Sequence, residues 1–206
     1  MKSIIVLGAS GHARVVCDMI IQQGKYNLCG LIAPAGTGFW DLPVLGTDDA
    51  LSALFERGVG QAAFVAVGAN QLRERLFHQL ECIGYELPNI IHKNAELSSK
   101  AVFGRGICIS AGVIVNAGAQ IGNGCILNTN CSIDHDDVIN DFCHVAPGST
   151  LCGNVKVGSV SFLGAGCRVI DGIHIGSRVT VGAGATVIRD LPDNCTAVGV
   201  PAQIIK

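Results

Sequence analysis

Hydrophobic positions along the chain follow two different periods, and the change falls near residue 95. In the first part, short apolar runs alternate with stretches whose apolar residues recur every three or four positions. The short runs predict buried strands, and the second pattern predicts amphipathic helices. We expect strands at 2–8, 27–33 and 61–68, and helices at 12–24, 48–58 and 70–84. This alternation predicts an α/β domain with a small parallel sheet.

In the second part an apolar residue recurs at every sixth position, sixteen times in succession from Leu97 to Val187. The position two residues before it holds a small or β-branched residue, with Asp137 as the one charged exception. A period of six is typical of the hexapeptide form of the parallel β-helix, in which each unit supplies a short strand and a turn. Three units close one triangular coil, so the pattern predicts about five coils around an apolar column.

We therefore divide the chain into an α/β domain at 1–92, a β-helix at 93–190 and a capping tail at 191–206. The tail leaves the six-residue register. Pro192 and Pro201 are expected to prevent further regular strand pairing there, because proline has no N–H to donate to a ladder. A cap of this kind would cover the open end of the solenoid.

Composition excludes several classes of function. The net charge is −2 and no basic block occurs, so the sequence has no electrostatic footprint for nucleic acid or for a membrane surface. No apolar run approaches the roughly 20 residues that span a bilayer. The ten cysteines form no CxxC pair, and four of them occupy the small position of the repeat. We interpret them as buried, reduced thiols of a cytoplasmic protein.

One segment of the repeat contains several charged and titratable residues, whereas the rest is mostly small and apolar. It reads DHDD from Asp134 to Asp137, and His144 follows nine residues after His135. Histidine is the side chain best suited to general-base work near neutral pH, and an adjacent carboxylate would fix its tautomer and raise its basicity. Asp136 is the first choice for this partner, with Asp134 and Asp137 as alternatives. We expect the two histidines to lie close together on an exposed face of the prism.

The first predicted strand and helix are joined by a glycine-containing loop, GASGH at 8–12. Backbone N–H groups at such a helix start are suited to hold a phosphate. Arg14 stands near the place of the third glycine of a dinucleotide-binding motif, so the loop does not predict a nicotinamide cofactor.

These features together carry a resemblance that covers essentially the whole chain. The GASGH start is followed by NTNCSIDHD, HVAPG, LCGNVKVG, FLGAG and VTVGAGATVIRDLPDN, and the chain closes on AVGVPAQII. The sequence resembles bacterial sugar acetyltransferases of the sialic acid O-acetyltransferase (NeuD) type, a group that includes N-acetyltransferases of UDP-4-amino-sugars. The resemblance implies a Rossmann-like domain followed by a left-handed parallel β-helix, assembled as a homotrimer.

The resemblance also implies a reaction. Acetyl-CoA, bound in a groove between neighbouring β-helices, would acetylate the amino group of a nucleotide-linked amino sugar for surface glycan biosynthesis, with no metal and no acyl-enzyme. By position, His135 matches the general base, Asp136 the acidic residue that orients it, and His144 a histidine near the thioester. Further residues implied to line the coenzyme groove are Gly153, Ala165 and Ala183.

For the acceptor, the resemblance implies phosphate contacts from the first loop. The residues at these positions are Ser10, Gly11 and His12. Relatives carry an acidic residue after the second strand, where this sequence has Ala33 and Pro34. Either the nucleotide is held otherwise, by Gly68 and Asn70 of AVGAN, or the acceptor is not the usual UDP-sugar. UDP, GDP and CMP carriers all stay open, and so does an acceptor without a nucleotide.

Three other functions also stay open. The same base would serve a hydroxyl, so O-acetylation of sialic acid or a related sugar is an alternative. A zinc hydratase of the carbonic-anhydrase type is a second, with His135, His144 and His174 as ligands, although their spacings of nine and thirty do not match the expected H-x4-H pair. A non-catalytic nucleotide-binding scaffold is the third.

Overall fold

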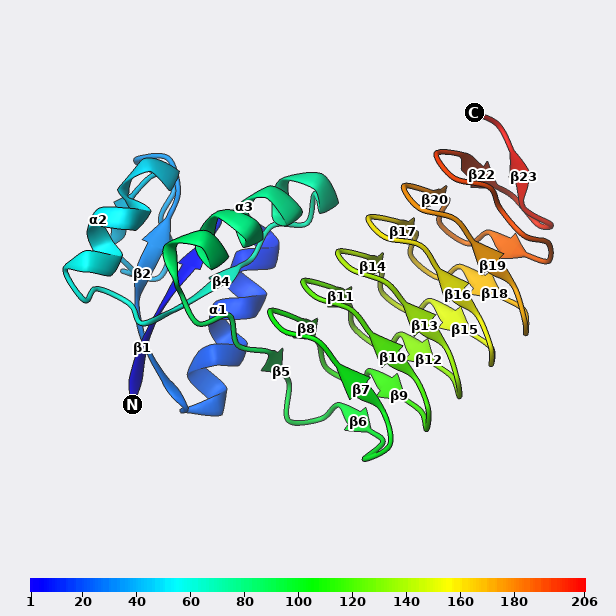
Figure 1. Cartoon of the computed structure of the whole chain (residues 1–206), viewed down its shortest axis with the longest axis horizontal. Helices are drawn as coiled ribbons and strands as arrows, with labels where there is room; N and C mark the ends of the chain where they lie inside the picture. Colours follow the sequence, from blue (N-terminus) through cyan, green and yellow to red (C-terminus); the bar gives the residue numbers. More distant parts are fainter. The chain divides into compact units, whose positions relative to one another are not determined.

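The computed structural model describes residues 1–206, which separate into two compact units, Met1–Ile90 and Ile91–Lys206. The strands of the first unit are β1 (Lys2–Leu7), β2 (Tyr26–Ile32), β3 (Val44–Gly46) and β4 (Ala62–Val65). Its helices are α1 (Gly11–Gln23), the 3-10 turn η1 (Asp48–Ala50), α2 (Leu51–Glu56) and α3 (Asn70–Ile83). The four strands form a parallel sheet with the order β3-β2-β1-β4 (Figure 1). The predicted α/β domain is confirmed, and β3 is an additional strand too short to stand out in the sequence.

Local sequence explains where the helices of this unit end. α1 and α3 both stop at a glycine in the left-handed region, Gly24 with φ +62° and Gly84 with φ +105°. Their N–H groups donate to carbonyls of the last helical turn, which closes each helix. Ile4, Ile5 and Val6 of β1 are fully buried, because β1 lies in the middle of the sheet. None of the helices has the length and apolar character that crossing a bilayer requires.

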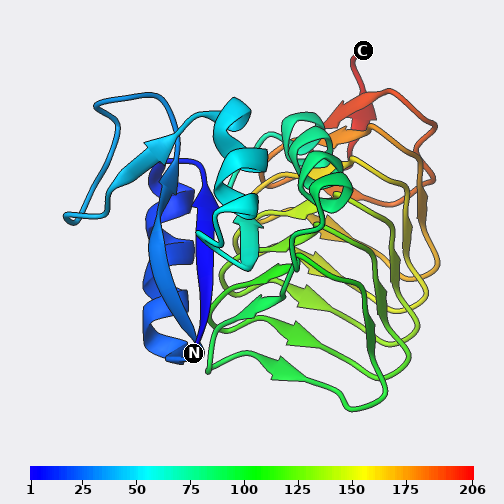
Figure 2. The same cartoon turned by 60° about the vertical axis from the view of Figure 1, so that its left-hand side comes forward.

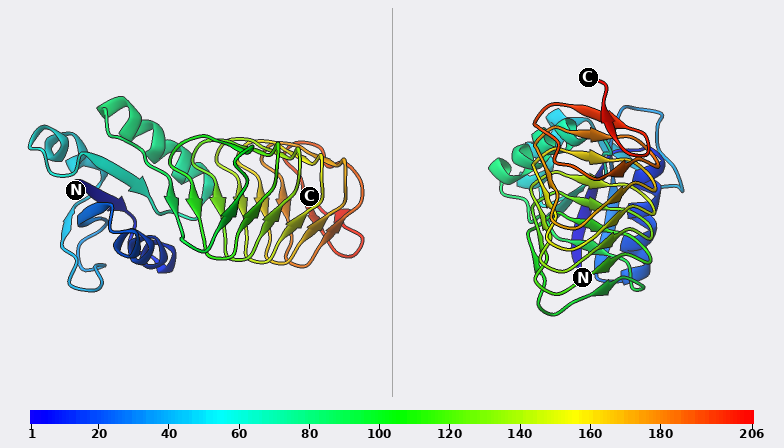
Figure 3. Two further views of the ribbon diagram at one scale, coloured as in Figure 1. Left: turned by 90° about the horizontal axis from the view of Figure 1, so that it is seen from below. Right: turned by 90° about the vertical axis from the view of Figure 1, so that its right-hand side faces the viewer.

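The second unit is a left-handed parallel β-helix built from strands of two residues. All sixteen residues of the six-residue pattern occupy the second position of a strand, from β6 (Glu96–Leu97) to β21 (Thr186–Val187). Each strand pairs in parallel with the strand 18 residues further on, as Gln120 does with Val138. Three strands therefore complete one coil, and successive coils stack (Figure 3). The predicted fold class is confirmed.

The other strands follow the same period until the last coil. They are β5 (Ile90–Ile91), β7 (Val102–Phe103), β8 (Cys108–Ile109), β9 (Ile114–Val115), β10 (Gln120–Ile121), β11 (Ile126–Leu127), β12 (Ser132–Ile133), β13 (Val138–Ile139), β14 (His144–Val145), β15 (Thr150–Leu151), β16 (Lys156–Val157), β17 (Phe162–Leu163), β18 (Arg168–Val169), β19 (His174–Ile175), β20 (Thr180–Val181), β22 (Thr196–Val198) and β23 (Gln203–Ile204). Every third strand belongs to the same sheet, and we name the sheets after β12, β13 and β14. The register begins one unit earlier than the sequence pattern indicates, because β5 already lies in the β14 sheet beside β8.

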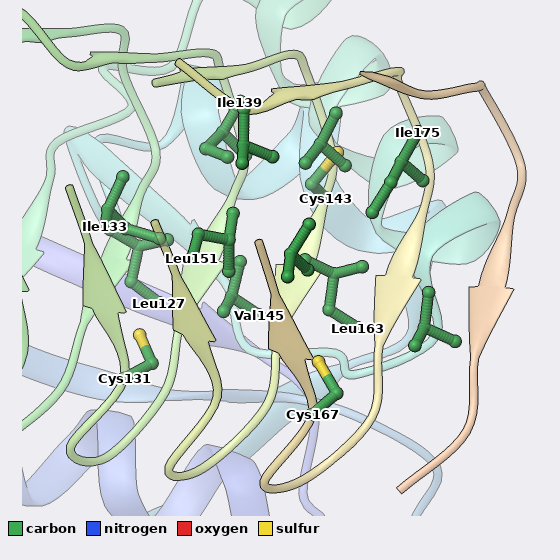
Figure 4. Close-up of a cluster of buried hydrophobic side chains, with 14 of the residues drawn as sticks. Leu127, Cys131, Ile133, Ile139, Cys143, Val145, Leu151, Leu163, Cys167 and Ile175 are labelled. Carbon is green, nitrogen blue, oxygen red and sulfur yellow. The ribbon is translucent and has the colours of Figure 1, made fainter. Parts of the chain in front are cut away.

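Inward side chains fill the prism in columns that run along its axis (Figure 4). Ile133, Val145, Leu151 and Leu163 are all buried in this cluster. Full burial of an aliphatic side chain of this size stabilises the fold by about 1.5–3 kcal/mol relative to exposure. The six-residue pattern thus holds the coils together through a continuous apolar core.

Small polar groups in the inward columns satisfy carbonyl groups of the turns. The Cys143 thiol donates to the carbonyl of Gly158 at 3.1 Å, and the Ser149 hydroxyl donates to that of Gly164 at 2.9 Å. None of the ten cysteines forms a disulfide, and burial raises the pKa of Cys131 to about 12. Three thiols differ from the buried state we expected: those of Cys82 and Cys152 are exposed, and that of Cys29 is half-buried.

The C-terminal tail continues the β-helix for part of a further coil. β22 pairs in parallel with β20, and β23 returns antiparallel to β22 (Figure 2). The expectation that Pro192 and Pro201 prevent strand pairing is wrong, because both prolines lie in the turns between paired residues. This coil is two residues shorter than the others, since Thr180 pairs with Thr196. The shorter coil breaks the six-residue pattern without breaking the sheet.

Candidate active site

The DHDD segment forms the turn 134–137 between β12 and β13, on the edge where the β12 and β13 sheets meet. The neighbouring coils have Gly118 and Asn154 at the place of Asp136, and all three residues are left-handed, with φ of +80°, +61° and +60°. Glycine and asparagine tolerate this region best. Aspartate also adopts this region, and Phe142, Val160 and Arg178 do so in turns at another edge of the prism, so the conformation of Asp136 follows from the coil geometry.

His135 and Asp136 form the central pair of the site. Nδ1 of His135 lies 3.0 Å from Oδ2 of Asp136. A carboxylate only accepts, so Nδ1 carries the proton and the neutral ring has its lone pair on Nε2. The hydrogen bond to Asp136 raises the pKa of His135 above its usual value, and the charge of Asp134 adds to this effect. The side chain is 54% exposed, so the ring is open to a substrate from outside the prism.

Neighbouring coils hold the backbone of His135 from both sides. Oδ1 of Asp134 accepts hydrogen bonds from the N–H of His135 and from Nδ2 of Asn116, both at 2.8 Å. These bonds lower the pKa of Asp134, the one from Asn116 most. The N–H of Asn154 donates to the carbonyl of His135 at 3.0 Å. The turn is therefore fixed to the coil before it and to the coil after it.

Gly153 lies beneath the imidazole, one coil after His135. A Cβ atom on Gly153 would overlap Cε1 and Nε2 of His135. The φ angle of Gly153 is not in the left-handed region, so glycine is needed here for space and not for backbone conformation. The resemblance implied only a coenzyme contact for this residue. The sequence contains a signal for the second role, because Gly153 stands 18 residues after His135, the length of one coil.

Asp137 does not face His135. Its side chain points into the prism and is fully buried. Oδ1 accepts the N–H of Val155 at 2.8 Å, and Oδ2 accepts the N–H of Asp134 at 2.9 Å. Burial raises the pKa of Asp137 to about 7. Of the three aspartates considered as the partner of the ring, the structure pairs Asp136 with it.

His144 lies in β14, in the sheet opposite the edge that carries His135. Its Nε2 is 3.2 Å from Nδ2 of Asn128, and its ring packs edge-on against Phe162 with centroids 5.2 Å apart. The expectation that His135 and His144 share one face is therefore wrong for a single chain. Nine residues are half a coil, and half a coil leads to the opposite side of the prism.

The residues predicted for the coenzyme fall into two groups. Gly153 lies on the edge of His135, whereas Ala165 and Ala183 are exposed on successive coils at the edge between the β14 and β12 sheets, next to the sheet of His144. One face of the prism separates the two groups. A groove lined by both groups would therefore have to form between two chains.

An open depression of about 580 Å³ adjoins the edge of His135. Its lining residues are Asn154, Lys156, Gly172, Ile173 and His174. Lys156 and His174 are paired neighbours in the β13 sheet. The depression thus offers a cationic side chain one coil beyond the imidazole.

The three histidines of the zinc alternative do not converge in one chain. His135 lies on an edge, His144 in the β14 sheet and His174 in the β13 sheet. Nowhere in residues 1–206 do three His, Cys, Asp or Glu side chains come together in a metal-binding arrangement. One chain therefore does not provide the ligand set that a zinc hydratase of this kind requires.

The first loop places its three candidate residues at the start of α1. Ser10 is the N-cap and makes no side-chain capping bond, and Gly11 is the first helical residue. Burial, together with the charge of Arg73, lowers the pKa of His12 to about 4, so the ring is neutral at physiological pH. Nε2 of His12 is buried without a hydrogen-bond partner. A polar group of a ligand would satisfy such an atom.

Arg73 of α3, whose charge helps to lower the pKa of His12, holds the AVGAN segment in place. Its buried guanidinium donates to the carbonyls of Val67 and Gly68 at 3.0 and 3.2 Å and to Oδ1 of Asn70 at 2.8 Å. β1 and β4 are neighbours in the sheet, so the loops that follow them lie at the same carboxyl edge. Carboxyl edges of parallel sheets are where such folds bind ligands.

Acidic groups do reach the end of β2, although they do not follow this strand directly in the sequence. A cavity of about 300 Å³ is lined by Ala33, Pro34, Thr47, Asp48 and Asp49. The hydroxyl of Thr47 donates to Asp49 and lowers the pKa of that carboxyl. The sequence did not show this arrangement because it depends on β3, which brings its following turn beside β2.

Comparisons with known proteins agree with this architecture. Residues 3–80 match the PglD N-terminal domain family. The whole chain is similar to perosamine N-acetyltransferase from Caulobacter crescentus, known as a histidine-to-asparagine variant in complex with CoA and GDP-perosamine. The TM-score is 0.96 and the identity 39%, over 100% of this chain and 98% of that one. The chain belongs to the NeuD/PglD-type acetyltransferase family.

This NeuD/PglD-type acetyltransferase is also similar to the acetyltransferase domain of PglB from Neisseria gonorrhoeae. The identity is 33% and the TM-score 0.93, over the full length of both chains. A serine acetyltransferase from Synechococcus elongatus is 37% identical over 76 residues, which are 33% of this chain and 31% of that enzyme. The chain thus spans only about a third of the length of that relative.

Proposed function

We propose that the chain transfers the acetyl group of acetyl-CoA to the amino group of a nucleotide-linked amino sugar, with His135 as the general base. The observation that carries the proposal is the exposed imidazole whose Nδ1 is bonded to Asp136, because this leaves the lone pair on Nε2. The Caulobacter relative holds CoA and GDP-perosamine, and the Neisseria domain is known with acetyl coenzyme A. Both complexes support the two substrates. The product would serve surface glycan biosynthesis.

The reaction needs one base and no covalent intermediate on the protein. The neutral amine attacks the carbonyl carbon of the thioester, so that a C–N bond forms and the C–S bond breaks. Nε2 of His135 takes the proton that the amine nitrogen loses, and Asp136 stabilises the imidazolium. The proton then passes to the departing CoA thiolate. Cys143 is not required as a nucleophile, because its thiol points into the prism and donates to Gly158.

A homotrimer would complete the site. The edge with His135 and Gly153 would face, on a neighbouring copy, the region of His144, Ala165 and Ala183. The coenzyme would bind in the groove between the two copies. The separation of the two groups within one chain supports this assembly, because a groove lined by both groups needs two chains. Positioning both substrates in one groove would supply much of the rate acceleration.

The first unit would hold the nucleotide of the acceptor. The start of α1 offers backbone N–H groups for a phosphate. The unpartnered Nε2 of His12 supports a ligand at this place. The loop that Arg73 holds presents Gly68 and Asn70 at the same edge of the sheet.

The test is a thiol-release assay with acetyl-CoA and a panel of acceptors. The panel contains UDP-, GDP- and dTDP-linked amino sugars, their hydroxyl counterparts and free or CMP-linked sialic acids. We expect release only with amino sugars, and a product whose acetyl group resists hydroxylamine, as an amide does. A hydroxylamine-labile product would instead show O-acetylation. If no acceptor releases CoA, the proposed reaction is wrong.

A further inference from the structure

A carboxylate lies inside the apolar column at one place, Asp137. The equivalent inward positions of the other coils hold Ala119, Val155 and Ile173, all within the hydrophobic cluster. A buried carboxylate is unfavourable unless hydrogen bonds compensate it. Asp137 and His135 belong to the same coil. The buried carboxylate in the core and the exposed imidazole on the surface therefore lie in one turn.

The backbone ladder is interrupted at that turn. At equivalent places of the neighbouring coils, the N–H of Asn116 donates to the carbonyl of Ile133 and the N–H of Cys152 to that of Val169, both at 3.0 Å. The N–H groups at 98 and 170 follow the same rule. The N–H of Asp134 donates instead to Oδ2 of Asp137, at 2.9 Å. The side chain of Asp137 thus takes the place of a backbone acceptor.

The second oxygen of Asp137 reaches the next coil. Oδ1 accepts the N–H of Val155, 18 residues further on, at 2.8 Å. The hydroxyl of Ser161 accepts the N–H of Val179 with the same 18-residue step, at 3.0 Å. A hydroxyl is therefore sufficient for the link between coils. What distinguishes the carboxylate is its other oxygen, which binds the first residue of the turn that contains the imidazole.

We propose that Asp137 is a positioning residue that closes the turn 134–137 from inside the prism and thereby holds the His135–Asp136 pair in its reactive geometry. The proposal rests on the proposed function in one respect, since it takes His135 as the base. Asp134 and Asp137 are the two ends of a four-residue turn, and the hydrogen bond between them leaves the two residues between them little freedom. The imidazole is then held by this turn and by its contact with Gly153.

Electrostatics agree with this role. Burial raises the pKa of Asp137 to about 7, while the N–H groups of Val155 and Asp134 oppose that rise. The charged groups that act on it are Asp134, which raises its pKa, and His135, which lowers it. The two N–H groups therefore favour the ionised carboxylate, whereas burial favours the protonated form.

The experiment compares Asp137→Ser with Asp137→Val and with the matched control Ser161→Ala. Serine keeps an acceptor for Val155 but does not reach Asp134, and valine copies the residue one coil further on. The control removes the corresponding link between coils far from the turn. We expect both Asp137 variants to lower kcat about 10- to 100-fold with little change in the KM for acetyl-CoA, and Ser161→Ala to keep kcat within about 2-fold.

A direct readout of the ring accompanies the kinetics. NMR titration of the His135 imidazole is expected to give a lower pKa in Asp137→Ser than in the unchanged protein, because the contact with Asp136 loosens. The fall should nearly vanish in an Asp136→Asn background, whereas loss of the Asp137 charge alone would lower the pKa equally in both backgrounds. Circular dichroism identifies the variants that fold. If Asp137→Val does not fold, the proposal is tested by Asp137→Ser alone. A folded Asp137→Ser protein with an unchanged titration and unchanged kcat would overturn the proposal.

The two proposals fail in different ways. If His135→Asn retains full activity, the proposed base is wrong. The NMR titration still measures whether Asp137 positions the ring in that case, because it does not depend on turnover. If instead His135→Asn abolishes transfer and Asp137→Ser changes neither the titration nor kcat, only the positioning role is wrong.

Discussion

The imidazole of His135 occupies the space that a Cβ atom on Gly153 would fill, one coil further along the β-helix. The contact is possible because residue 153 has no side chain, and the 18-residue coil brings the two positions into line. The relationship between His135 and Gly153 illustrates how the β-helix positions the candidate site. The residue at the equivalent position of the next coil limits where the side chain can lie.

Gly153→Ala tests this contact. The added methyl group would overlap Cε1 and Nε2 of His135 and displace the ring, while the backbone conformation suits alanine. We expect kcat to fall about 10- to 100-fold, since a displacement of about 1 Å can cost two orders of magnitude. Steady-state kinetics with both substrates measure it.

A double-mutant cycle provides the control for this substitution. If Gly153→Ala acts through the imidazole, it should have almost no further effect in a His135→Ala background. An equal loss in both backgrounds would show that Gly153 acts on the coenzyme groove or on the fold instead.

Asp136→Asn should change the pH dependence of the reaction in a defined direction. The hydrogen bond that His135 donates to Asp136 is the largest cause of the raised pKa of His135, and an amide is a weaker partner for an imidazolium. The pKa of His135 should therefore fall, and the acidic limb of kcat/KM should move to lower pH. The maximal rate should fall as well, because the base is weaker.

Asp171→Asn is the matched control for the electrostatic part. The charge of Asp171 also raises the pKa of His135, as the last of the causes. We expect a shift of the acidic limb in the same direction but smaller than in Asp136→Asn. A limb that moves to higher pH in either variant would contradict the assignment of that limb to His135.

His12→Ala should weaken acceptor binding selectively. The ring is neutral and its buried Nε2 has no partner within the protein, so a hydrogen bond to the acceptor would be lost. We expect the KM for the nucleotide sugar to rise about 3- to 10-fold, the effect of one hydrogen bond. The KM for acetyl-CoA should stay unchanged. A change in the latter alone would place His12 outside the acceptor site.

Asp137→Asn should change how stability depends on pH. The pKa of Asp137 is raised from 3.8 to about 7 in the folded chain, so the folded state binds this proton more tightly than the unfolded state. Its contribution to stability therefore falls as pH rises from about 4 to about 7 and is constant above. Asparagine does not ionise. The Tm of the variant minus that of the unchanged protein should thus increase over this range, as thermal melts at several pH values would show.

The fold of the second unit could be predicted in detail because it repeats. One apolar residue in six determines the strands, and every one of the sixteen predicted positions points inward. Departures occur where the period changes. The last coil is two residues shorter, so Thr196 meets Thr180 although the six-residue pattern has ended.

The site could be predicted only in part, because sequence proximity and spatial proximity differ in a solenoid. His135 and Asp136 are adjacent in both. His144 is nine residues away and lies on the opposite side, whereas Gly153 is 18 residues away and touches the ring. In the first unit, the cavity that joins Ala33 to Asp49 depends on β3, a strand of three residues without a clear pattern.

The rate of acetyl transfer by the His135→Asn variant most directly tests the claim that His135 is the general base. The measurement is the single-turnover rate of acetyl transfer from acetyl-CoA to the best acceptor of the panel, together with the affinity for CoA. With His135 as the base, the rate should fall about 10²- to 10⁴-fold while CoA still binds. A rate within a few-fold of that of the unchanged protein, with both substrates bound, would contradict it.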